Sequence, residues 1–269
     1  MNQLRDALEK LGVDDLHFWV KARPENITHN VLKAARRLGV GQVFLGIEQV
    51  TLARLKYLGR IHTPEDNHTA LSLLKEYNIQ SCFNLMMFDP DCNIDEVDAA
   101  ISFARQYADV PWNICRTEIY PGTTIYERLQ NARRLTGDFI HTDYTMTDPA
   151  CELMFSIMRV AFFNRSFNVD SLINRLATLF FTLEATSRLC PGEVASQNLE
   201  AGQKLLQIIN LDTANRLQMA RDFVKSEIEK SPQEVQLFAM NLAMDMNDSD
   251  HLWHQEINGM FDKVERQNN

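Results

Sequence analysis

Long hydrophobic runs are absent from this sequence of 269 residues, and so is the basic and apolar pattern of a secretory signal at its start. We therefore expect a cytoplasmic protein without a membrane partner. Positive charge is also scarce, because 27 lysines and arginines stand against 36 aspartates and glutamates, for a net charge of −9. A surface of that sign repels phosphate backbones, which argues against nucleic acid as the main partner.

Cysteines are few and dispersed: the chain has five, Cys82, Cys92, Cys115, Cys151 and Cys190. No two of them have the spacing of a zinc site or a redox motif, and their odd number does not suggest a disulfide framework. We interpret them as buried or idle thiols in a reducing cytoplasm. The sequence also lacks a glycine-rich phosphate loop and a nucleophile elbow, and its histidines form no metal-ligand pattern.

Residues 1–135 instead show a regular alternation of apolar runs and amphipathic helical windows. We expect strands at residues 16–22, 42–48, 80–88 and 112–120. Thr28, Thr63 and Asn93 are in position to cap the helices between them, and Gly39 is in position to end the first of these helices. This alternation predicts βα units and a parallel sheet, and four strands would leave a barrel incomplete.

The second half of the chain has a different pattern. After about residue 135, we expect helices that begin near Asp148-Pro149 and continue through windows at residues 168–189, 192–230 and from 231 onward, with nothing strand-like among them. The predicted fold is therefore α/β, with an incomplete parallel βα barrel of the partial TIM type over residues 1–135 and an all-helical module over residues 136–269.

Polar residues follow each of the expected strands. In parallel α/β folds, ligands bind at the carboxyl ends of strands. The residues at these ends include Arg23, Glu48, Asp89, Arg116, Glu118 and Tyr120. Charged groups beside apolar strands are costly unless they meet each other or a ligand. A structural ion-pair network and a shared ligand pocket both satisfy this requirement, and spacing alone does not choose between them.

Four segments, in order, resemble the radical S-adenosylmethionine (radical SAM) enzymes. The phrase "RRLGVGQVFLGIEQVTLARLKYLGR" is similar to the fourth strand of that family, and "HTPEDNHTALSLLKEYNI" to the helix that follows it. "FNLMMFDPDCNIDEVDAAISFAR" resembles the fifth strand and helix, and "CRTEIYPGTTIYERL" the sixth strand with its Pro-Gly-Thr turn. The segments "MMFDPD" and "EIYPGT" are similar to the corresponding segments of the branch that has a cobalamin-binding domain. The resemblance covers about residues 1–135.

This resemblance implies cofactors and chemistry. In the intact family, a CxxxCxxC loop holds a 4Fe–4S cluster, which cleaves S-adenosylmethionine to a 5′-deoxyadenosyl radical, and cobalamin is a further candidate cofactor. The cluster loop and the first strands would lie upstream of Met1 in this alignment. The five dispersed cysteines do not replace that loop. We therefore expect this chain alone to be catalytically inactive.

The resemblance also implies roles for the residues at the strand ends. Glu48 and Arg23 are the candidates to bind S-adenosylmethionine. The candidates to bind a small-molecule or peptide substrate are Asp89, Arg116, Glu118 and Tyr120. Gln49 stands where the family commonly has serine, and "FDPD" replaces its usual Gly-x-Pro turn, so contacts at these two places depart from the family pattern.

Two other hypotheses remain open. The chain is alternatively a non-catalytic remnant, used as a binding or assembly protein, whose apolar edge at residues 16–22 is covered by a second copy or a partner chain. The other alternative is an unrelated βα-barrel enzyme in which Glu48 or Asp89 acts as a general base.

Overall fold

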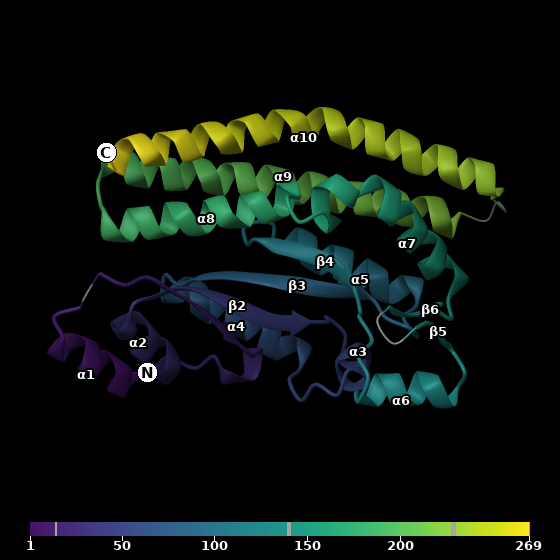
Figure 1. Ribbon diagram of the computed structural model, residues 1–269, viewed down its shortest axis with the longest axis horizontal. Coiled ribbons are helices and arrows are strands. Elements are labelled where there is room, and N and C mark those ends of the chain that lie inside the picture. Colours follow the sequence, from purple (N-terminus) through teal and green to yellow (C-terminus); the bar gives the residue numbers. More distant parts are fainter. Residues whose placement is uncertain (14, 139–140, 227–229, 269) are drawn as a thin grey trace.

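The computed structural model describes residues 1–13, 15–138, 141–226 and 230–268. Within them, four parallel strands form one sheet whose spatial order follows the chain (Figure 1). These strands are β1 (Phe18–Ala22), β2 (Val40–Glu48), β3 (Gln80–Phe88) and β4 (Trp112–Arg116). The predicted parallel βα arrangement is confirmed. The described strands form an open sheet, so a partial barrel stays a prediction.

Two of the expected strands are shorter in the structure. The first begins at Phe18 and not at residue 16, and the fourth ends at Arg116 and not at residue 120. Beyond Arg116 the chain leaves the sheet and turns, with the backbone of Thr123 donating to the carbonyl of Tyr120 and Gly122 in a left-handed conformation. The proline and glycine of this turn end the strand, although the apolar pattern continues past it.

Helices with well-defined ends connect the strands. They are α1 (Asn2–Lys10), α2 (His29–Leu38), α3 (Leu52–Tyr57), α4 (Pro64–Glu76), α5 (Ile94–Gln106) and α6 (Thr124–Asn131). The predicted caps are confirmed: Thr28 accepts from the backbone of Val31, and Thr63 and Asn93 each form a capping box. Gly39 ends α2 at a φ of 106°, which favours glycine.

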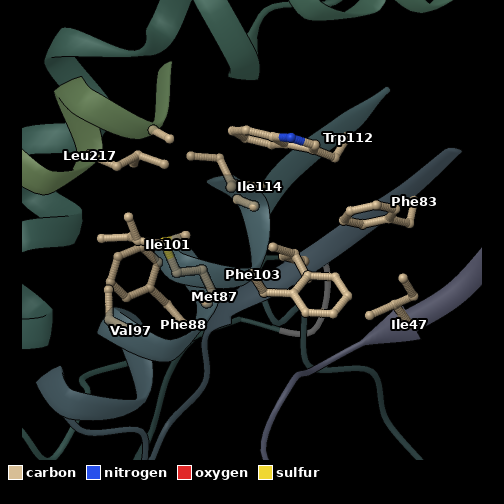
Figure 2. Packing of buried hydrophobic residues seen from close by; sticks show 14 of the residues in the cluster. Ile47, Phe83, Met87, Phe88, Val97, Ile101, Phe103, Trp112, Ile114 and Leu217 are labelled. Atoms are coloured by element: carbon tan, nitrogen blue, oxygen red, sulfur yellow. The ribbon is translucent and has the colours of Figure 1, made fainter. Parts of the chain in front are cut away.

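The sheet has one face covered by helices and one that is more open. Leu45, Phe83 and Ile114 belong to the cluster of buried side chains on the covered face, together with residues of α5 such as Ile101. Figure 2 shows this cluster, which also includes Leu217 from the second half of the chain. The opposite face, called the inner face below, carries Trp19, Lys21, Phe44, Cys82, Asn84, Asn113 and Cys115, all of them partly buried or exposed.

The prediction that nothing strand-like follows residue 135 is wrong. A short antiparallel hairpin is formed by β5 (Leu135–Gly137) and β6 (Thr142–Tyr144). Each strand has three residues, which is too short for a periodic sequence signal. A residue of β4 stabilises the hairpin: the guanidinium of Arg116 binds the Asp143 carboxylate at 2.7 Å and the Tyr144 carbonyl.

The remaining elements are helical, as predicted. They are α7 (Pro149–Ala161), the π-helix η2 (Phe163–Phe167), α8 (Leu172–Leu189), α9 (Glu193–Lys225) and α10 (Pro232–Asn268). Helices α8, α9 and α10 run side by side, with α8 nearest the sheet (Figure 1). In the described part of the chain, no helix combines the length and the apolar character needed to cross a membrane.

Contacts join the two halves closely. The main hydrophobic cluster contains residues of the sheet together with residues of α7, α9 and α10, and a smaller cluster lies among α8, α9 and α10. On the surface, Lys225 of α9 pairs with Asp95 of α5 at 2.6 Å. The division into domains at residues 135 and 136 stays a prediction.

Candidate functional site at the strand ends

Glu48, the last residue of β2, has an unusual backbone conformation. Its φ is 63°, in the left-handed region that non-glycine residues rarely adopt. The register between β2 and β3 also shifts between Leu45 and Glu48. Such irregularities re-aim a side chain at the end of a strand and are common beside ligand sites.

Gly46 makes room for the Glu48 carboxylate. A Cβ atom at position 46 would lie 3.3 Å from Oε1 of Glu48 and 3.6 Å from the carbonyl oxygen of Ala22. The carboxylate therefore folds back along the inner face, close to the end of β1. This arrangement explains why a buried strand carries a glycine two positions before a glutamate.

Arg60 is the partner of this carboxylate. Its Nη2 atom lies 2.9 Å from Oε1 of Glu48, and both side chains are partly buried. Arg60 comes from the loop between α3 and α4, where neither a periodic pattern nor a strand end points to it. Sequence reasoning missed this residue for that reason.

A buried histidine lies beside the same strand end. Nδ1 of His62 is 3.5 Å from a carboxylate oxygen of Glu25, and Nε2 is 3.3 Å from the carbonyl oxygen of Ile47. His62 thus connects the short helix η1 (Pro24–Asn26), which follows β1, to the end of β2.

Arg23 lies at the surface. Its side chain is 62 % exposed and its guanidinium is 4.0 Å from Glu25. An exposed pair at that distance contributes little to stability. The predicted role of Arg23 in cofactor binding stays a prediction.

The side chain of Asp89 is fully buried. One carboxylate oxygen accepts from Arg54 at 3.1 Å and from the backbone of Asp91 at 2.9 Å. Burial raises the pKa of Asp89, and the Asp91 amide and Arg54 act against this rise. Arg54 also lies 3.0 Å from Glu96, so Asp89 joins the end of β3 to α3 and to the start of α5. These contacts are the ones expected of a structural ion-pair network, which is the alternative to a ligand pocket at this strand end.

Arg116 is committed to the hairpin. Besides Asp143 and the Tyr144 carbonyl, its guanidinium lies 3.8 Å from the centre of the Tyr144 ring and 4.9 Å from that of Phe155. The structure therefore does not bring Arg116 together with Glu48.

Glu118 and Cys115 complete the group around Glu48. The pKa of the Cys115 thiol is raised to about 12, first by burial and then by the negative charges of Glu48 and Glu118. The hydroxyl of Tyr120 donates to the carboxylate of Glu118. Cys115, which the sequence suggested to be idle, thus lies on the inner face within range of both carboxylates.

Charged groups of both signs meet at this end of the sheet. Two carboxylates, Glu48 and Glu118, act on Cys115, and the guanidinium of Arg60 neutralises one of them. The raised pKa keeps the thiol neutral at neutral pH. Among the described residues Glu118 has no ion-pair partner, so its carboxylate is available to a ligand that carries positive charge.

The described residues do not provide a cluster of metal ligands. No three of their His, Cys, Asp or Glu side chains come together in a group that could hold a metal ion. Cys92 and Cys151 are buried in the core, Cys190 is exposed at the end of α8, and Cys82 and Cys115 lie on different strands. This donor set does not fit a 4Fe–4S cluster.

The chain is an α/β protein with a parallel sheet followed by long helices. Its sequence is similar to that of a known protein. The "Uncharacterized methyltransferase PH0819" of Pyrococcus horikoshii is 27 % identical over 141 residues, which cover 52 % of this chain and 30 % of that protein. No protein-family model matches the chain.

The fold is similar to that of a solved enzyme. The cobalamin-dependent S-adenosylmethionine radical enzyme OxsB, with aqua-cobalamin bound, aligns with a TM-score of 0.55 and 13 % identity over 98 % of this chain and 49 % of that one. Its structure with aqua-cobalamin and S-adenosylmethionine aligns with a TM-score of 0.49 and 13 % identity over 95 % of this chain and 48 % of that one. This chain thus spans less than half the length of either protein, and the likeness to OxsB is one of fold.

Proposed function

We infer that this chain forms the S-adenosylmethionine-facing and substrate-facing part of a cobalamin-type radical SAM enzyme. The fold shared with OxsB across nearly the whole chain supports this inference, and so do the four ordered sequence segments. The methyltransferase relative agrees with an S-adenosylmethionine-dependent activity. We extend cobalamin dependence to the complete enzyme and assign no residue of this chain to hold it.

Glu48 is the observation that carries the proposal. S-adenosylmethionine bears a sulfonium and an ammonium group, and Glu48 presents a carboxylate at a strand end that also holds the carboxylate of Glu118. The strained backbone and the glycine at position 46 place that carboxylate on the inner face. In this role Glu48 holds a cationic group of the cofactor, and Glu118 with Tyr120 contacts a small-molecule or peptide substrate.

We assign the ligands of the 4Fe–4S cluster to polypeptide other than this chain. When bound, a 4Fe–4S cluster supplies the electron that cleaves S-adenosylmethionine, but the cysteines of this chain do not fit as its ligands. We therefore infer that the chain binds and orients the cofactor and is inactive unless other polypeptide provides the cluster.

Calorimetric titration of the chain with S-adenosylmethionine tests this proposal. Replacing Glu48 by glutamine removes the charge and keeps the shape, and we expect about tenfold weaker binding, as is typical of a lost charged hydrogen bond. The matched control is Glu127→Gln on α6, an exposed residue, which should leave the affinity unchanged.

A second ligand tests the charge directly. S-adenosylhomocysteine lacks the sulfonium charge but keeps the ammonium group. Its affinity should therefore respond less than that of S-adenosylmethionine to Glu48→Gln where Glu48 holds the sulfonium, and equally where Glu48 holds the ammonium group. Absence of saturable S-adenosylmethionine binding to the wild type, or equal affinity of the wild type and Glu48→Gln, would contradict the assigned role.

A binding or assembly role through the edge of the sheet is the second candidate. In the described residues β1 pairs only with β2, and Trp19 of β1 is 46 % exposed. Association at this edge should appear as a dimer in light scattering, and Trp19→Ser should weaken it. The control is Leu252→Ser on α10, where a similarly exposed apolar residue lies on another surface. A monodisperse monomer would count against this candidate.

A further inference from the structure

A cavity of about 560 Å³ lies between the inner face of the sheet and helix α8. Trp19, Phe44 and Asn84 are among the side chains on its sheet side, and Thr178 and Phe181 are among those on its helix side. Its volume falls in the range of small-molecule sites. Both walls therefore come from this chain.

The cavity is separate from the strand-end site. Its residues lie near the beginnings and middles of the strands: Gln42 is the third residue of β2, whereas Glu48 is the last. At about 3.3 Å per residue, these two positions are roughly 20 Å apart along the strand. The other end of the cavity reaches toward the strand-end site, because Asn84 lies between the register partners of Leu45 and Glu48. No residue of the group around Glu48 lines the cavity, so a ligand here does not require that Glu48 binds a cofactor.

Helix α8 is fixed over this end of the sheet by polar contacts. Gln80, the first residue of β3, donates to Glu184 at 2.5 Å, and Arg188 donates to the carbonyl of Gly39 at 2.8 Å. The ring of Phe181 meets that of His17 with centroids 5.2 Å apart. The helix therefore forms a stable wall opposite the strands.

The walls are aromatic and uncharged. The rings of Trp19 and Phe44 meet edge to face with centroids 6.2 Å apart, and Phe181 faces the sheet from α8. No Asp, Glu, Lys, Arg or His is among the described residues that line the cavity. Burial raises the pKa of Cys82, also in the wall, to about 11, so this thiol is neutral as well. The ammonium of Lys21 lies beside these walls, 5.7 Å from the centre of the Trp19 ring and 5.6 Å from that of Phe44. No carboxylate is among the described lining residues, so a cationic ligand would lose its hydration here without a counter-charge.

Four amide side chains line the cavity: Gln42, Asn84, Asn113 and Asn174. Asn174 already donates to the carbonyls of Asn168 and Val169. Asn84 and Asn113 are register partners in β3 and β4. Asn113 is already committed, because it donates to the carbonyl of Ser166 at 3.1 Å and accepts from the backbone of Ile114 at 2.8 Å. Asn84 makes no side-chain hydrogen bond within the described part of the chain, so its two donors and one acceptor are available to a ligand.

We propose that this cavity is a binding site for an uncharged, planar aromatic molecule that carries both a hydrogen-bond acceptor and a donor. The rings of Trp19, Phe44 and Phe181 contact its faces, and the Asn84 amide pairs with its polar edge. An amide recognises a lactam or a carboxamide through two antiparallel hydrogen bonds. We therefore expect the ligand to carry one of these two groups.

The probes are 2-quinolone, a neutral bicyclic lactam, and naphthalene, which has a similar shape but no polar atoms. We expect saturable binding of 2-quinolone to the full chain in ligand-observed nuclear magnetic resonance. Asn84→Leu should weaken 2-quinolone binding five- to tenfold and leave naphthalene binding unchanged or stronger.

A cavity-filling variant locates the site. Thr178→Trp should abolish binding of both probes, whereas Leu189→Trp, at the exposed end of the same helix, should leave it unchanged. Circular dichroism verifies that each variant is folded. Lack of saturable 2-quinolone binding to the wild type, or binding that survives Thr178→Trp, would overturn the proposal. Equal weakening of both probes by Asn84→Leu would overturn the role of the amide.

Discussion

The guanidinium of Arg60 lies 2.9 Å from the carboxylate of Glu48, and this ion pair is made by a residue whose backbone is in the left-handed region. A side chain with a Cβ atom is disfavoured there by roughly 1–2 kcal/mol relative to glycine. The fold thus keeps a glutamate where glycine would be better tolerated. That cost is typical of positions retained for function.

Replacing Glu48 separates the backbone cost from the ion pair. Both Glu48→Ala and Glu48→Gly lose the contact with Arg60, but only glycine relieves the left-handed strain. We expect Glu48→Gly to be more stable than Glu48→Ala by about 1 kcal/mol in urea unfolding. In the control, Glu127 within helix α6, the order should be reversed, with alanine more stable than glycine by about 1 kcal/mol. The same order at both positions would refute the strain at Glu48.

Removing Arg165 should strongly destabilise the helical half. Its side chain is fully buried and binds Asp212 at 2.5 Å, Ser249 at 3.2 Å and the carboxylate of Asp250. Arg165→Met leaves buried carboxylate without its partner, at an expected cost of about 3–5 kcal/mol in the free energy of unfolding. Arg159→Met, on the exposed surface of α7, should change it by less than about 0.5 kcal/mol. A loss below about 1 kcal/mol for Arg165→Met would be incompatible with this network.

Close packing between α8 and α9 depends on Gly202. A Cβ atom at this position would overlap Cδ1 of Leu183, which is buried on α8. Gly202→Ala should therefore lower the free energy of unfolding by about 1–3 kcal/mol, although alanine favours helix. At Gly259 of α10 a Cβ atom meets nothing within 4 Å, so Gly259→Ala should instead gain about 0.5–1 kcal/mol. Thermal unfolding of both variants checks this contrast, which a gain at Gly202 would disprove.

His17 should make stability depend on pH. Burial, and next the charge of Arg188, lower the pKa of His17 below the ordinary histidine value of about 6.5. The unfolded chain then binds a proton more readily than the folded one, so stability is lost as pH falls below about 6.5. His17→Phe should remove this part of the pH dependence between pH 7.5 and 5.5.

The control for that titration is His141→Gln, because His141 lies at the surface with its side chain 86 % exposed. This variant should keep the pH profile of the wild type. Parallel profiles for the wild type and His17→Phe would show that His17 titrates normally in the folded chain.

Local features of the sequence predicted the local structure. Thr28, Thr63 and Asn93 begin their helices as expected, because a cap depends on a few neighbouring backbone amides. The strand at residues 80–88 was predicted with its observed bounds, since its apolar run is flanked by polar residues on both sides. The parallel order of the sheet follows from the same alternation of strands and helices.

Contacts distant along the chain were not predictable in this way. The hairpin of β5 and β6 is held by Arg116, and Glu48 is paired with a loop arginine that no pattern marks. Asp89 and Arg116 carry the same charges at strand ends as the other candidates, yet the structure commits them to Arg54 and to Asp143. Which partner each of these charged side chains meets depends on packing.

The sequence by itself determined the parallel sheet, the caps of its helices and the long helices of the second half, because each depends on periodicity and on contacts within a few residues. It did not determine the hairpin of β5 and β6. Tertiary structure decided which strand-end groups share a site, since only the folded chain sets the distances among Glu48, Arg60 and Cys115. It also decided that α8 covers the beginnings of the strands and forms one wall of an open cavity there, an arrangement that depends on contacts between residues more than 100 positions apart.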